Sequence, residues 1–168
     1  MQEAGAAALS DKPFAESCVE NRAPILAVLR EVFADRRHVL EIGSGTGQHA
    51  VYFAPELPHL TWQTADVPQH NAGIRLWLAE AALPNVLAPL ELDVNRTEWH
   101  SGRYDAVFSA NTLHIMSWPE VERLFAGIGT VLESGGVLAI YGPFNINGAY
   151  TSESNARFDA WLKARDPA

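Results

Sequence analysis

The sequence predicts an α/β fold, in which a mostly parallel β-sheet is covered by helices on both faces. Short apolar runs alternate along the chain with segments in which apolar residues recur every three or four positions. This alternation implies right-handed strand–helix–strand units and therefore parallel strands. A glycine-rich turn directly after the first apolar run is also typical of such folds. The chain of 168 residues is expected to form a single domain, 1–168, with one sizeable core.

Five expected strands carry the sheet. The first contains Val39, Leu40 and Ile42, and the others are Thr61–Asp66, Val86–Leu92, Tyr104–Ser109 and Gly136–Tyr141. The second strand ends at Asp66, the third is followed by Asp93, and the fourth leads to Asn111. Because the ligand crevice of an open parallel sheet lies beyond the carboxyl ends of its strands, these three polar side chains are the first candidates for a binding site.

Four helices are expected around these strands. Their apolar stripes are Ile25, Val28, Leu29 and Val32 in the first, Ile74, Trp77, Leu78 and Ala81 in the second, Val121, Leu124, Phe125 and Ile128 in the third, and Phe158, Trp161 and Leu162 in the last. Pro24 is expected in the first turn of the first helix, because elsewhere it removes a helical hydrogen bond. The third helix opens with a capping box of Ser117 and Glu120 and is expected to end at Gly135 and Gly136.

Three glycines stand at alternate positions in the stretch from Glu41 to Gly47. Glycine permits a tight turn and a close approach to a ligand, which a Cβ would prevent. The dinucleotide fingerprint has glycines at relative positions one, three and six, and here the sixth position is Gln48. The alternating pattern instead resembles motif I of the Rossmann-like methyltransferases that use S-adenosylmethionine (SAM), a ligand without phosphate. A tight structural loop is the alternative for a glycine-rich turn taken alone.

Three acidic residues accompany this turn. Asp66 follows Gly47 by 19 positions, about where an acid can accept hydrogen bonds from both hydroxyls of a ribose. Dinucleotide-binding folds share this feature, so it does not separate SAM from NAD. Asp93 follows the third strand, where SAM enzymes often bind the adenine amino group, and for both aspartates the alternative is a turn former or helix cap. Glu41, in an otherwise apolar strand, needs a partner, and the ammonium group of a bound ligand would supply one.

Composition excludes several classes of function. The 12 Lys and Arg against 20 Asp and Glu give a net charge of −8, which repels nucleic acid and favours a small molecule or protein as substrate. The six histidines lack metal-ligand spacing, so no metal site is expected. Cys18 is the only cysteine, which fits a reducing cytoplasm, and neither a signal peptide nor a membrane-spanning segment is expected.

Several segments together carry a more specific resemblance. They are Asn21–Leu26, Leu40–His49, Ser109–Trp118, Tyr141–Asn145 and Ser154–Asp159. These segments resemble a SAM-dependent methyltransferase-like family that has long been described as a domain of unknown function, and whose animal members are called methyltransferase-like protein 26. The Asn-Thr-Leu-His-Ile and Tyr-Gly-Pro-Phe segments are much more specific than motif I. The resemblance runs from about the first helix to the last residue and implies the Rossmann-like SAM-dependent methyltransferase fold.

This resemblance implies SAM as the cofactor. Carried over residue by residue, it assigns cofactor binding to Glu41, Gly43, Ser44, Gly45, Gly47, Asp66 and Asp93, with Asn111 beside the methionine moiety. Family members continue beyond Asp166 into a further strand pair, which is apparently absent here. The fifth strand would then be an exposed edge that favours pairing with a second copy, so a homodimer is one expectation, and an incomplete chain is the other.

The expected function is transfer of a methyl group from SAM to a small molecule. The sulfonium already activates this methyl group, so the main task of the protein is to position the acceptor. His114 follows the fourth strand, and its ordinary pKa of about 6.5 suits a base that removes the acceptor's proton; a histidine that only orients a loop is the alternative. A SAM-binding protein without transferase activity, acting as a sensor or in a complex, is the second hypothesis. An NAD-dependent oxidoreductase is the third, and Gln48 counts against it.

Overall fold

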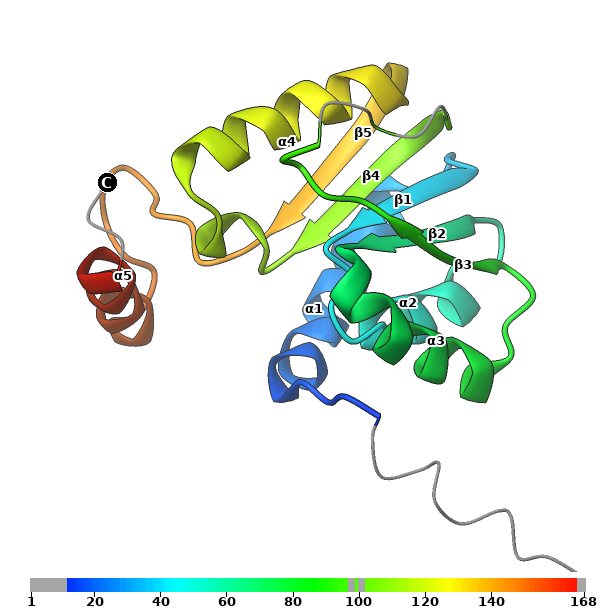
Figure 1. Cartoon of the computed structure of the whole chain (residues 1–168), viewed down its shortest axis with the longest axis horizontal. Coiled ribbons are helices and arrows are strands. Elements are labelled where there is room, and N and C mark those ends of the chain that lie inside the picture. Colours follow the sequence, from blue (N-terminus) through cyan, green and yellow to red (C-terminus); the bar gives the residue numbers. More distant parts are fainter. Residues whose placement is uncertain (1–11, 97–98, 100–101, 166–168) are drawn as a thin grey trace, which may run out of the picture.

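The computed structural model describes residues 12–96, 99 and 102–165. A sheet of five parallel strands lies at its centre, in the order β3-β2-β1-β4-β5 (Figure 1). The strands are β1 (His38–Ile42), β2 (Thr61–Asp66), β3 (Val86–Glu91), β4 (Tyr104–Ala110) and β5 (Leu132–Tyr141). Each expected strand overlaps an observed one, so the α/β fold predicted from the sequence is confirmed.

Helices cover both faces of this sheet. They are α1 (Glu16–Val32), α2 (Gln48–Phe53), α3 (Pro68–Ala81), α4 (Trp118–Val131) and α5 (Glu153–Arg165), with short 3-10 helices η1 (Ala54–Glu56) and η2 (Leu113–Ile115). Figure 1 shows α1, α2 and α3 on one side of the sheet and α4 on the other. The last helix, α5, stands apart from the sheet, beyond the carboxyl ends of β4 and β5 (Figure 1).

Alternate residues of the central strands enter two hydrophobic cores, one on each face. In β1, Val39 packs into the core beside α1 and α2, whereas Leu40 packs into the core beside α4. The first core contains Phe53, Trp62 and Phe108, whose ring centroids lie 5.6 to 5.9 Å apart. Both faces of the central strands β1 and β4 are covered, so most of their residues are buried. This packing fixes the end of β1, from which the glycine turn emerges.

The expectation that Pro24 lies in the first turn of its helix is wrong. The helix α1 begins at Glu16 and contains Pro24 in its interior. Proline has no N–H, so it cannot donate the α-helical hydrogen bond to the carbonyl of Glu20. Both residues lie on the exposed side of α1, where that carbonyl is not sealed inside the core.

The helix α4 ends before the predicted stop at Gly135 and Gly136, and that part of the prediction is wrong. The helix passes directly into β5 at Leu132, which has extended backbone (φ −78°, ψ 131°) and pairs with Tyr104. The two glycines lie instead within β5, where the register of pairing shifts and Gly135 has φ of +77°. The predicted capping box at Ser117 is present.

In the described part of the chain, β5 and β3 are the two outer strands of the sheet. The homodimer expected from an exposed β5 edge stays a prediction, since the structure contains a single chain. No helix among the described residues combines the length and apolar composition needed to cross a bilayer.

Candidate functional site

A cleft of about 550 Å³ lies beyond the carboxyl ends of the strands, where the strand order reverses between β1 and β4. Its walls come from the glycine turn, the end of β2, the start of α3, the segment after β4 and the segment that leads into α1. The cofactor residues predicted from the sequence that line this cleft are Gly43, Ser44, Gly45, Asp66 and Asn111. The location is the one expected for the ligand of an open parallel sheet.

The three glycines of the turn all have positive φ, but for different reasons. A Cβ on Gly43 (φ +73°) would lie 2.5 Å from Thr112 Oγ1, and a Cβ on Gly47 (φ +90°) would lie 3.3 Å from the α-carbon of Ile74. On Gly45 (φ +59°), a Cβ would have no atom within 4 Å among the described residues other than Gly45 and its two chain neighbours, and Gly45 lines the cleft. Gly43 and Gly47 therefore permit close packing of the turn, whereas Gly45 leaves room for a ligand beside the backbone.

Asp66 ends β2 and lies in the wall of the cleft. Its Oδ2 accepts a hydrogen bond of 2.6 Å from the N–H of Gly45. Its Oδ1 accepts bonds from the N–H of Val67 at 2.7 Å and from His70 Nδ1 at 2.9 Å. These bonds fix the carboxylate against the glycine turn. Each carboxylate oxygen has two acceptor sites, so Oδ2 retains one for a ligand hydroxyl.

Glu41 lies under the turn and is not part of the cleft lining. It is 2% exposed, and its Oε2 accepts hydrogen bonds of 3.0 Å from both Trp62 Nε1 and Ser44 Oγ. Burial raises the pKa of Glu41 from 4.5 to about 7, the two hydrogen bonds oppose that rise, and the nearby charge of Asp66 adds to it. The sequence did not identify the partner of the Glu41 carboxylate. The structure shows that Trp62 and Ser44 of the protein itself donate hydrogen bonds to it.

Replacing Glu41 with glutamine is expected to flatten the pH dependence of stability between about pH 5 and about pH 8. A carboxyl group whose pKa rises on folding stabilises the fold fully below its unfolded value of 4.5, and this contribution is lost as pH rises through about 7. The wild type should lose roughly 2 kcal/mol of unfolding free energy across this window. Glutamine, which keeps an acceptor oxygen for Trp62 and Ser44, should lose much less. Urea denaturation at both pH values measures the difference, and equal losses would contradict a titrating buried carboxyl.

Asp93 and Asn111 occupy different surroundings. Asp93 lies outside the cleft lining, and its Oδ1 accepts a hydrogen bond of 2.9 Å from the N–H of Asn95, the turn-forming arrangement considered as its alternative. Its cofactor role stays a prediction. Asn111 has left-handed backbone (φ +54°), which asparagine tolerates, and its N–H donates to the carbonyl of Tyr141 at 2.8 Å. Asn111 thereby joins the ends of β4 and β5 at the wall of the cleft.

A second cavity, of about 750 Å³, adjoins the cleft and shares Ser17 and Asn111 with it. It lies between α1, the carboxyl ends of β4 and β5, and α5. His114 lines this second cavity and not the cleft, and its ring and that of Phe158 meet in an edge-to-face arrangement, with centroids 5.1 Å apart. Burial lowers the pKa of His114 below 6.5. The imidazole is therefore mostly neutral at neutral pH, the form that accepts a proton.

A buried pair between the cleft and the second cavity was missed by the sequence analysis. His49 Nε2 lies 2.7 Å from Asn21 Oδ1; His49 lines the cleft and Asn21 lines the second cavity. Burial lowers the pKa of His49 from 6.5 to about 4, so its ring is neutral at physiological pH. The signal available in the sequence was weak: Asn21 stands four positions before Ile25 and so lies on the buried face of α1.

Gln48 binds the segment before α1, a role that its position in the glycine pattern did not predict. Its Oε1 accepts a hydrogen bond of 2.6 Å from the N–H of Ala15, just before α1. Nearby, Trp77 Nε1 donates to the carbonyl of Pro13 at 2.6 Å, and Lys12 Nζ lies 3.7 Å from the centroid of the Trp77 ring. These contacts hold the segment before α1 against α2 and α3, where it forms one wall of the cleft.

Solved methyltransferase structures share this architecture. The chain superposes on an O-methyltransferase family protein from Burkholderia thailandensis with a TM-score of 0.73 and 23% identity, covering 86% of this chain and 45% of that one. On the mitomycin 7-O-methyltransferase MmcR it superposes with a TM-score of 0.74 and 18% identity, covering 88% of this chain and 42% of that one. On the structure described as PigF with SAH it superposes with a TM-score of 0.69 and 25% identity, covering 87% of this chain and 49% of that one. The chain thus spans less than half of each of these proteins and has the fold of their matching part.

A family model covers almost the whole described chain. The model of the family described as "Protein of unknown function (DUF938)" matches residues 12–168, which include the glycine turn, Asp66, His114 and α5. The match extends over far more than half of the sequence. The chain therefore belongs to the DUF938 family, and its fold is that of SAM-dependent methyltransferases.

Proposed function

We propose that this protein binds SAM in the cleft and transfers its methyl group to a small molecule in the second cavity. The observation that carries the proposal is the arrangement of Gly45 and Asp66: an open backbone position and a fixed carboxylate share one wall of the cleft. The similarity to methyltransferase folds supports it. The proposal includes a single SAM-binding domain over residues 1–168 that acts in the cytoplasm.

The residues present fit this cofactor. Apart from Gly45 and its two chain neighbours, no described residue has an atom within 4 Å of a Cβ built on Gly45, so the ligand has room there. Asp66 Oδ2 retains an acceptor site for a ribose hydroxyl. When bound, SAM supplies a methyl group that leaves its sulfur for the acceptor atom, with release of S-adenosylhomocysteine. In this assignment the turn and Asp66 hold the nucleoside, and Asn111 lies beside the methionine moiety.

The acceptor would approach from the second cavity, because Asn111 and Ser17 border both spaces. His114 would take the proton that an acceptor hydroxyl or ammonium loses, since its neutral imidazole lines that cavity. Positioning by the cavity walls would supply most of the remaining rate.

A search for methylated products tests this proposal. The protein is incubated with a small-molecule extract and SAM that carries a deuterated methyl group, and mass spectrometry detects labelled products. We expect labelled small molecules with the wild type and their loss in Asp66→Ala. Binding of SAM without any labelled product would favour the second hypothesis, a SAM-binding protein without transferase activity.

A further inference from the structure

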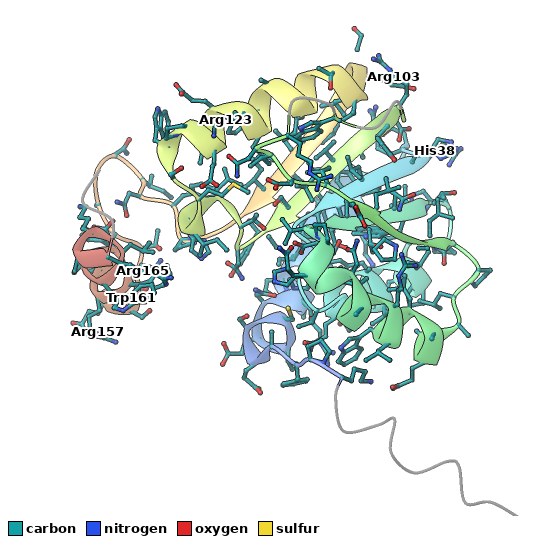
Figure 2. The ribbon with its side chains drawn as sticks, viewed as in Figure 1. His38, Arg103, Arg123, Arg157, Trp161 and Arg165 are labelled. Atoms are coloured by element: carbon teal, nitrogen blue, oxygen red, sulfur yellow. The ribbon has the colours of Figure 1, made fainter. Side chains whose placement is uncertain are left out.

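A third cavity, of about 260 Å³, lies between the end of β5 and the start of α4. Its walls come from η2, the start of α4 and residues 141–144, and we call it the apolar pocket. No Asp, Glu, Lys or Arg of the described residues lines it, and Arg123, which Figure 2 labels on α4, lies outside the lining. Among the described side chains that line it, only those of His114, Trp118 and Tyr141 contain nitrogen or oxygen. The pocket therefore offers a mostly apolar surface to the group that fills it.

His114 lies at the boundary between the apolar pocket and the second cavity. The two spaces share four lining residues, His114, Tyr141, Gly142 and Pro143. The ring of His114 meets that of Phe158, which lines the second cavity, in an edge-to-face arrangement. A Cβ built on Gly142 would lie 3.9 Å from His114 Nδ1 and 3.4 Å from the ring of Phe144, which lines the apolar pocket. The imidazole that would take the acceptor's proton therefore borders both spaces.

The apolar pocket has the size and chemistry for one ring-shaped group. An apolar cavity of roughly 150 Å³ is enough to bind benzene, so about 260 Å³ accommodates an aromatic ring with a short side chain. Phe144 is 48% exposed and Trp118 is 69% exposed, so much of their apolar surface meets water. An apolar group in the pocket would remove part of this surface from water, which is favourable. A charged group would lose its hydration without gaining an opposite charge.

The second cavity offers different chemistry. Its lining includes Asn111, Thr151 and Asn155, whose side chains can donate and accept hydrogen bonds, and the carboxylate of Glu20 adds a negative charge. The two adjoining spaces together therefore match a molecule with one polar end and one apolar end. His114 borders both spaces, so an acceptor atom at the junction of the two ends would lie beside the imidazole.

We infer that the methyl acceptor carries an uncharged apolar group, of the size of an aromatic ring with a short side chain, and that this group occupies the apolar pocket while the acceptor atom lies beside His114. The inference rests on the proposed function, since it names the class of the methyl acceptor. Met116 and Phe144 line the apolar pocket and not the second cavity, so these two residues select for the apolar group.

Nuclear magnetic resonance with two probes of equal shape tests the inference. The chain contains two methionines, Met1 and Met116, so ¹³C labelling of the methionine methyl groups gives one signal from the apolar pocket and one reference signal. The protein is also labelled with ¹⁵N and saturated with S-adenosylhomocysteine, and the backbone N–H of Gly45 reports that binding. Para-ethylphenol and para-hydroxybenzyl alcohol, which differ only by a methyl group in place of a hydroxyl group, are then titrated separately.

The expected result is a preference for the apolar probe. Para-ethylphenol should shift the Met116 signal, leave the Met1 signal unchanged, and show nuclear Overhauser contacts between its ethyl protons and the Met116 methyl group. It should bind about tenfold more tightly than para-hydroxybenzyl alcohol, because an apolar lining compensates poorly for the lost hydration of the second hydroxyl group. The phenol hydroxyl, which both probes share, stands for the acceptor atom.

Two matched phenylalanine changes separate recognition from folding. Phe144 and Phe125 are similarly exposed, at 48% and 45%, but Phe125 lines neither the apolar pocket, the second cavity nor the cleft. Phe144→Ala should weaken para-ethylphenol binding about five- to tenfold, because the apolar group loses its contact with the ring. Phe125→Ala should leave that binding unchanged. Both variants should bind S-adenosylhomocysteine as the wild type does, and a melting curve shows that each is folded.

The outcomes are distinct for the two proposals. A Gly45 signal that does not respond to S-adenosylhomocysteine would contradict the proposed function, and with it the inference. A normal Gly45 response combined with equal affinities for the two probes, with no shift of the Met116 signal, or with equal effects of the two phenylalanine changes would overturn the inference alone. A Met116 signal that shifts with protein concentration in the absence of a probe would show that a second copy covers the pocket, and this result would also overturn the inference.

Discussion

Replacing His114 with asparagine is expected to lower the turnover of methyl transfer by about 10² to 10⁴ at neutral pH while leaving the affinity for S-adenosylhomocysteine unchanged. The imidazole lines the second cavity and not the cleft, so its loss should affect the acceptor and spare the cofactor. Burial lowers the pKa of His114 below 6.5. The wild-type rate should therefore rise with pH through that lowered pKa and reach a plateau near neutrality. The rate of the variant should not rise with pH in this range.

A matched histidine change provides the control. His38 is exposed at the start of β1, and Figure 2 shows it far from the labelled residues of α5. His38→Asn should leave the turnover and its pH profile unchanged. A small, pH-independent loss in His114→Asn would indicate a histidine that only orients its loop, and a parallel loss of S-adenosylhomocysteine affinity would place His114 in the cofactor site instead.

Replacing Asp66 with alanine is expected to weaken S-adenosylhomocysteine binding by about ten- to hundredfold. A carboxylate that accepts from ribose hydroxyls forms charge-assisted hydrogen bonds of roughly 1.5 to 3 kcal/mol. The change also frees the N–H of Gly45, which donates to Asp66 at 2.6 Å, so the turn should lose part of its fixed geometry. Isothermal titration calorimetry measures the affinity, and a melting curve shows whether the variant is folded.

Asp93→Ala is the comparison for this experiment. Asp93 lies outside the cleft lining and caps a turn at Asn95, so its replacement should weaken binding less than that of Asp66. The opposite ranking would mean that the adenine end of the ligand, and not the ribose, carries most of the affinity. Unchanged binding in a folded Asp66→Ala protein would remove Asp66 from the site.

The sheet and the glycine turn could be predicted because their signals are local. The apolar residues Val39, Leu40 and Ile42 of β1 form a short run that only Glu41 interrupts, and the glycines at 43, 45 and 47 directly follow it. The strand ends then had to meet at one edge, which brought Asp66 and Asn111 into the same cleft. The helix α2 was missed because its six residues are too few to show a periodic stripe.

The partners of the site residues could not be predicted, because they come from distant parts of the chain. Asn21 meets His49 across 28 positions, and Gln48 meets the N–H of Ala15 across 33. Glu41 was expected to need a partner such as the ammonium group of a ligand, but Trp62, from the neighbouring strand, already donates to it. Pro24 was placed by the general rule against proline inside helices, and the exposed face of α1 next to the second cavity allows the exception.

A crystal structure of the protein with S-adenosylhomocysteine tests the central claim most directly. The account predicts that the ligand occupies the cleft, with its ribose hydroxyls against Asp66, its backbone contact at Gly45 and its amino-acid end beside Asn111. The second cavity should then open toward the sulfur atom. A cleft that excludes S-adenosylhomocysteine and instead binds NAD, with the pyrophosphate against the glycine turn, would contradict the account.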